Sequence, residues 1–143
     1  MIKVKRIDHV AIAVADRDAS AASLTALFGL APGARETVAA QATDVAFLHA
    51  GGVDDAAIEL CAPAGGAGSG AIARFLGRRG PGLHHVCFEV DDLPAALAQL
   101  KAAGVRLIDE APRPGARGHQ VAFLDPAATG GVLFELCSSE THA

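Results

Sequence analysis

The stretch RIDHVAIAV, residues 6–14, returns later in the chain as GLHHVCFEV, residues 82–90. In both copies apolar residues alternate with other residues, which is the pattern of a half-buried β-strand. Each copy also places a histidine, His9 or His85, inside its most apolar part. A strand histidine that occurs twice at matching positions indicates a duplicated module in which the histidine has a shared purpose.

The duplication keeps one offset of 76 residues, the separation of His9 from His85. At the same offset, VAFLHAGGVDDAAIELC at 45–61 aligns without a gap on VAFLDPAATGGVLFELC at 121–137. We therefore predict two modules, at 1–66 and 80–143, joined by a linker and a short helix at 67–79. The chain of 143 residues is expected to form a single domain, because either half alone is too small for a comfortable core.

Each module is predicted to have the order β-α-β-β-β, which gives an α+β fold. In the second module, Asp92 can cap a helix whose apolar stripe consists of Leu93, Leu97 and Leu100, and Gly104 stands at its end. The matching helix of the first module is expected at 17–28. Three strands should follow the helix in each module, and their predicted ranges are 34–40, 44–50 and 56–61, then 106–110, 119–125 and 131–137.

Composition limits the possible functions. Hydrophobic residues make up 51% and charged residues 20%, as in a globular protein. The net charge is −4, without a basic stripe and without Trp or Tyr, which counts against nucleic-acid binding. No apolar run approaches the roughly 18 residues of a membrane span, and the N-terminus lacks the apolar core of a signal peptide. The three cysteines have no CxxC spacing, so we expect a cytoplasmic protein without disulfides or structural zinc.

Strand alternation places one histidine and one glutamate of each module on the face opposite the apolar residues. A carboxylate in so apolar a strand needs a partner, because burying it unpaired costs several kcal/mol or shifts its pKa. A single strand histidine is more often structural, but four such residues at matched spacing favour a metal site. Two imidazoles and two carboxylates suit one divalent cation, Co²⁺ first, with Ni²⁺, Mn²⁺, Zn²⁺ or Fe²⁺ as alternatives. The predicted ligands are His9, Glu59, His85 and Glu135.

Several segments resemble, in order, those of the vicinal oxygen chelate superfamily, and within it most closely the methylmalonyl-CoA epimerases. They are RIDHVAIAV, IELCAP, GAIARFLGRRGPGLHHVCFEVDDL, GVRLIDEAPRPGARGHQVAFLDP and TGGVLFELC. The resemblance implies that the sheets of both modules form one metal-binding cleft and that the same four residues bind the metal. It also implies a homodimer, an acyl-CoA or thioester-like substrate, and inversion of C2 through a metal-stabilised enolate.

The chain departs from that family where the family's acidic base is expected, because Ala40 stands there. Glu36 and Asp44 are the nearest acids that could replace it, and Glu89, on the His85 face of its strand, is a further candidate that is more often structural. In the loop before the last strand, Ala127 and Ala128 replace a polar pair that would help to hold the thioester. These departures leave the predicted fold and metal site in place and bear on the substrate.

Two other functions are compatible with the sequence. Glyoxalase I-like lyases, which isomerise a hemithioacetal, resemble this chain in their two histidines and two glutamates. There a metal-bound glutamate acts as base, so Glu135 is a candidate acid or base and Ala40 would not matter. A non-catalytic, resistance-type binder of small molecules is the third possibility, although such sites favour aromatic walls and this chain has only six Phe. Extradiol dioxygenases commonly use two His and one Glu, so Glu59 argues against them.

Overall fold

The computed structural model describes residues 1–66 and 68–139, which form two compact units. The first unit is His9–His84, and the second is Met1–Asp8 together with His85–Ala143. Strand β1 (Val4–Ala13) therefore contributes to both units. Ala67, in the predicted linker, and residues 140–143, at the end of the predicted second module, lie outside the described residues.

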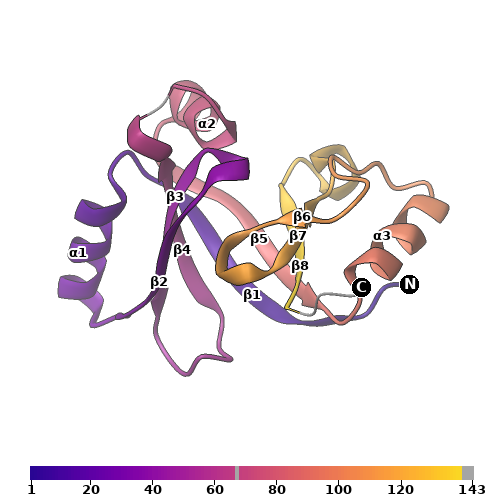
Figure 1. Cartoon of the computed structure of the whole chain (residues 1–143), viewed down its shortest axis with the longest axis horizontal. Helices are drawn as coiled ribbons and strands as arrows, with labels where there is room; N and C mark the ends of the chain where they lie inside the picture. Colours follow the sequence, from indigo (N-terminus) through magenta and orange to yellow (C-terminus); the bar gives the residue numbers. More distant parts are fainter. Residues whose placement is uncertain (67, 140–143) are drawn as a thin grey trace. The chain divides into compact units, whose positions relative to one another are not determined.

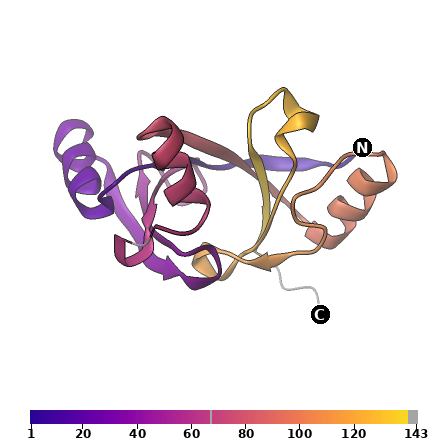
Figure 2. The ribbon, with the colours of Figure 1, turned by 90° about the horizontal axis from the view of Figure 1, so that it is seen from above.

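The first unit has the predicted order of elements. Its strands are arranged as β2-β3-β4-β1, with β1 parallel to β4 and the other neighbours antiparallel. Two helices, α1 and α2, belong to the same unit and lie apart from each other (Figure 2). After β1 the elements are α1 (Arg17–Phe28), β2 (Ala31–Val38), η1 (Ala39–Gln41), β3 (Thr43–His49), β4 (Ala57–Pro63), η2 (Ala64–Gly66) and α2 (Ala71–Arg79).

Helix α1 covers one face of this sheet. The Asp16 carboxylate begins the helix by accepting hydrogen bonds from the first-turn backbone N–H groups, and Gly29 ends it in the left-handed conformation. Leu24 of α1 packs against Leu48 and Leu60 of the sheet. Figure 1 shows α1 on one side of this sheet. Because strand side chains alternate, the residues of β1 and β4 that do not point toward α1 lie on the opposite face, and His9 and Glu59 are among them.

The second unit repeats this plan. Its strands are arranged as β5-β8-β7-β6, and the Val4–Asp8 part of β1 belongs to the same unit. Strands β5 and β8 are parallel, and the other two pairings are antiparallel. The elements are β5 (Gly82–Val90), α3 (Leu93–Ala102), β6 (Arg113–Pro114), η3 (Ala116–Gly118), β7 (Gln120–Phe123), η4 (Pro126–Thr129) and β8 (Phe134–Ser138).

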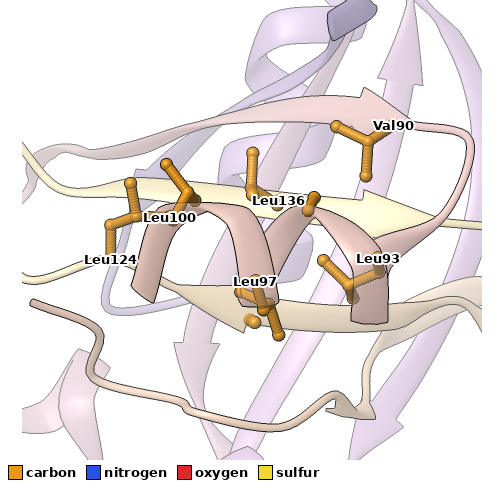
Figure 3. Close-up of a cluster of buried hydrophobic side chains, with 8 residues drawn as sticks. Val90, Leu93, Leu97, Leu100, Leu124 and Leu136 are labelled. Atoms are coloured by element: carbon orange, nitrogen blue, oxygen red, sulfur yellow. The ribbon is translucent and has the colours of Figure 1, made fainter. Parts of the chain in front are cut away.

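The predicted apolar stripe of α3 forms the core of the second unit. Leu93, Leu97 and Leu100 are buried and pack with Leu124 and Leu136 of the sheet (Figure 3). Asp92 caps the helix, as predicted, by accepting a hydrogen bond from the backbone N–H of Ala95. Burial of each leucine contributes about 1.5–3 kcal/mol to this packing. Among the described helices, none combines the length and the apolar character that a membrane span requires.

The strand predicted at 106–110 is wrong. That segment contributes only an isolated bridge between Leu107 and Leu124, and the next strand, β6, has two residues. The backbone N–H groups of Ile108 and Asp109 both donate to the carbonyl oxygen of Phe123, and the Asp109 carboxylate accepts from the Phe123 N–H, so no regular ladder forms there. Pro112 and Pro114, which have no N–H to donate, keep β6 short. The third and fourth predicted strands of this module, β7 and β8, are present and shorter than predicted.

Candidate metal centre

In the first unit, His9 of β1 and Glu59 of β4 lie on the sheet face opposite α1. The parallel register aligns Ala11 with Glu59, so His9, two residues earlier on β1, shares that face. Nε2 of His9 is 3.6 Å from Oε1 of Glu59, and both side chains are more than nine-tenths buried. The Phe47 ring meets the His9 imidazole edge to face at 5.6 Å, and the Cys61 thiol donates a hydrogen bond to Glu59. These contacts hold both polar side chains in one orientation.

The second unit contains the same arrangement 76 residues later. Nε2 of His85 is 3.4 Å from Oε1 of Glu135, and both residues are buried. The Phe123 ring, which corresponds to Phe47, meets His85 edge to face at 5.0 Å. The sequence repeat therefore preserves the histidine, the glutamate and the aromatic ring that orients the histidine.

Each histidine–glutamate pair offers ligand atoms that suit a divalent cation. Each unit brings an imidazole nitrogen and a carboxylate oxygen to one place, and these are ligand atoms that Zn²⁺, Co²⁺ and similar ions accept. A buried carboxylate requires compensating positive charge. A bound cation would supply that charge to the glutamate of each pair.

A further group of potential ligands in the second unit does not fit a metal. Ligand atoms of Asp8, His119 and Cys137 lie within 4.8 Å of one another. However, Oδ1 of Asp8 is 3.1 Å from the Arg6 guanidinium, and Oδ2 pairs with that of Arg117. These two cations neutralise Asp8 and would repel a metal ion, so we interpret the group as a buried ion-pair network.

The two candidate bases lie on different faces of the first sheet. The β2–β3 register pairs Glu36 with Val45, whose side chain shares a face with Phe47 and Glu59. The same register pairs Thr37 with Asp44 on the other face. Glu36 therefore belongs to the face that carries His9, whereas Asp44 does not.

Asp44 also has local partners of its own. Its carboxylate accepts hydrogen bonds from the Thr37 hydroxyl, at 2.5 Å, and from the Gly65 backbone N–H. The Thr37 bond is the main reason that the pKa of Asp44 lies below its ordinary value. A carboxylate with a lowered pKa is a weaker base, which is the wrong direction for proton abstraction from carbon.

His49 is a polar residue of this face that the sequence reasoning did not single out. It pairs with Ala57, which pairs in turn with His9, so the two histidines occupy one row across the sheet. Its Nδ1 is buried and has no hydrogen-bond partner among the described residues. Gly33 makes room for the ring, because a Cβ there would lie 2.4 Å from Nε2 of His49. The duplication could not identify His49, because the equivalent residue of the second module, 76 residues later, is Asp125.

Two other polar residues of β5 have structural roles. Glu89 is held by Arg6, whose Nε lies 2.7 Å from Oε2, and by Lys5 at 3.8 Å. The ring of His84 packs edge to face against Phe75 of α2 at 5.1 Å. Glu89 therefore serves as an ion-pair partner, and His84 anchors α2 to the start of β5.

Comparison with known proteins identifies the family. The model of the Glyoxalase/Bleomycin resistance/Dioxygenase superfamily matches residues 8–123, so the chain belongs to this superfamily, and the predicted vicinal oxygen chelate fold is confirmed. The ethylmalonyl-CoA/methylmalonyl-CoA epimerase of Cereibacter sphaeroides is 39% identical over 135 residues, which cover 93% of this chain and 97% of that protein. The uncharacterised Bacillus subtilis protein YqjC is 39% identical over 134 residues, with 94% and 92% covered.

A solved structure agrees with these relatives. A variant of the Streptomyces coelicolor methylmalonyl-CoA epimerase, in complex with 2-nitronate-propionyl-CoA, matches with a TM-score of 0.90 at 31% identity. The match covers 97% of each chain. This chain therefore has the fold of a protein that holds an acyl-CoA analogue.

Proposed function

We propose that the protein is a metal-dependent epimerase that inverts C2 of methylmalonyl-CoA or of a related 2-substituted acyl-CoA. The observation that carries the proposal is the duplicated pair of a buried histidine and a buried glutamate, with N–O separations of 3.6 and 3.4 Å. The names of the relatives supply the substrate class, since one of them acts on both ethylmalonyl-CoA and methylmalonyl-CoA.

In this proposal His9, Glu59, His85 and Glu135 together bind one divalent cation, with Co²⁺ as the first expectation. A bound cation supplies Lewis-acid stabilisation of the negative charge that develops on the substrate's oxygens. The chain's own contribution is to fix the ligands. Phe47 and Phe123 orient the two imidazoles, and the apolar surroundings keep water from competing at the two carboxylates.

Inversion at C2 requires one group that removes a proton and another that returns a proton on the opposite side of the carbon. We assign these roles to Glu36 and Glu135. Ala40 stands at the family's base position and has no acidic group. Glu36 is half-buried and lies on the face that carries His9 and Glu59, so it can take that role. Glu135 lies beside His85 in the other unit. Asp44 is left out, because it faces the other side of its sheet and its pKa is lowered.

Deuterium exchange tests the proposal directly. Purified protein with methylmalonyl-CoA in D₂O should incorporate deuterium at C2 while the two epimers interconvert, as followed by NMR and chiral analysis. The protein should also contain about one divalent ion per chain by elemental analysis, and His85→Ala should lose it. Metal content without exchange at C2 would overturn the epimerase assignment and leave the metal site standing.

The glyoxalase I-like reaction is the second candidate, and Ala40 favours it. A base provided by a metal ligand, such as Glu135, would not need an acid at position 40. The protein should then isomerise the hemithioacetal of methylglyoxal and a thiol. Activity in that assay, together with no exchange at C2 of methylmalonyl-CoA, would support the lyase. We also expect a homodimer, which light scattering of the purified protein can test.

A further inference from the structure

Helix α2 carries three arginines on its exposed surface. Arg74 and Arg78 are four residues apart and so lie on one face of the helix, and Arg79 follows directly. The opposite side is apolar, with Ile72 buried in the first unit. The helix is therefore held by its apolar side and presents the guanidinium groups to solvent.

These arginines have no carboxylate partner within residues 1–66 and 68–139, and in this they differ from most cations of the chain. The majority of the Lys and Arg side chains pair with an acidic residue, which matters in a chain of net charge −4. The paired cations are Lys5, Arg6, Arg17, Arg35, Lys101, Arg113 and Arg117. Three neighbouring cations without such partners concentrate positive charge at α2.

The guanidinium of Arg79 is oriented by a neighbouring aromatic ring. The Cζ atom of Arg79 lies 5.7 Å from the centre of the Phe75 ring, within the range of a cation–π contact. The Phe75 ring also packs edge to face against His84, near the start of β5. The planar fork of Arg79 is thus held partly in place, which lowers the entropy that a bound anion would have to offset.

Helix α2 borders the part of the first unit where the family's base is missing. A Cβ at Gly70, directly before α2, would lie 3.1 Å from the carbonyl oxygen of Gln41 and 3.3 Å from Cβ of Ala42. Gln41 ends η1, the turn that contains Ala40. At its other end α2 leads into β5, which carries His85. The arginines therefore lie on a helix that connects two segments of the proposed site.

We propose that Arg74, Arg78 and Arg79 bind the phosphates of the acyl-CoA substrate. This inference rests on the proposed function and assigns a binding site to the nucleotide end of the same substrate. The thioester end must reach the histidine–glutamate pairs, whereas the nucleotide end carries a diphosphate and a 3′-phosphate. Guanidinium groups bind phosphate oxygens through paired, charge-assisted hydrogen bonds. Binding energy gained at a remote anionic group also helps to position the reacting carbon.

The test compares two substrates that differ only in the nucleotide. Arg78→Gln combined with Arg79→Gln should raise KM for methylmalonyl-CoA about ten-fold and leave KM for methylmalonyl-pantetheine, which lacks the phosphates, unchanged. Arg106→Gln is the matched control, because Arg106 is an exposed arginine away from α2 and should change neither KM. An equal change for both substrates, or no change for methylmalonyl-CoA, would overturn the proposal.

A binding measurement separates this inference from the proposed reaction. Calorimetry with adenosine 3′,5′-bisphosphate requires no turnover, and the double variant should bind it about ten-fold more weakly than the wild type. Binding by the wild type should also weaken with added salt. If the wild type binds the nucleotide through α2 but does not epimerise methylmalonyl-CoA, the proposed function fails and the phosphate site stands. If it epimerises and the double variant binds the nucleotide as tightly as the wild type, the phosphate site fails.

Discussion

At the scale of single residues, whether a carboxylate can act as the base depends more on the sheet face on which it lies than on its place in the sequence. Glu36 and Asp44 are equally close to Ala40 along the chain, at four residues on either side. The β2–β3 register separates them, and it depends on how η1 turns the chain, which the sequence pattern does not show. The reasoning from sequence could therefore name both acids but could not choose between them.

Substitution of each acid by its amide should show this difference. We expect Glu36→Gln to lower the rate of deuterium incorporation at C2 of methylmalonyl-CoA by at least about 10²-fold, as loss of a general base does. Asp44→Asn, the matched control on the opposite face, should retain most of the wild-type rate. Equal loss in both variants would show that the face does not matter and that a different residue moves the proton.

The pKa of Asp44 provides a second test at this scale. Because Thr37 donates a hydrogen bond to the carboxylate, Thr37→Val should raise the pKa of Asp44 toward its ordinary value of 3.8, as followed by NMR of the carboxyl carbon. Since folding lowers this pKa, the ionised group stabilises the fold above pH 3.8, and the contribution disappears as the pH falls through the folded value. Thr37→Ser keeps the hydroxyl and should titrate as the wild type does.

At the scale of elements, hydrophobic periodicity predicts the helices and strands that bury one apolar face. The leucine stripe and the cap predict helix α3, and both are confirmed. The duplication predicts a strand at 106–110, because the counterpart of this segment in the first module is β2. There the Asp109 carboxylate takes the Phe123 N–H that a neighbouring strand would bind, and the prolines that follow keep β6 short, so this segment departs from its counterpart in the first module.

The packing of α3 predicts a large effect from one truncation. Leu97→Ala should lower the free energy of unfolding by about 2–5 kcal/mol, because Leu97 is fully enclosed in the cluster of the second unit. Leu27→Ala is the control, since Leu27 lies on α1 and is 73% exposed. Urea denaturation followed by circular dichroism measures both changes. Similar values for the two variants would contradict the assigned core.

At the scale of the whole molecule, the duplication explains why one chain carries two matched histidine–glutamate pairs. Each unit holds its pair by its own strands and its own phenylalanine, so each half of the ligand set is built locally. The sequence predicted the ligands because they follow the offset of 76 residues. The two rings follow the same offset, but their contacts with the histidines are seen only in the structure. His49 has no histidine counterpart in the second copy, and the α2 arginines lie between the two copies, so register, burial and the pairing of charges were needed to find them.

If one metal ion takes ligands from both pairs, its removal should lower the stability of the folded chain as a whole. Saturation at about 100 times the dissociation constant adds roughly 2.7 kcal/mol, so a strong chelator should lower Tm by roughly 5–10 °C in differential scanning calorimetry. His9→Ala and His85→Ala should each abolish the response to chelator, although each removes a ligand from a different unit. Glu110→Gln, an exposed acid paired with Lys101, should respond as the wild type does. A response that survives in either histidine variant would mean that the two pairs do not share one ion.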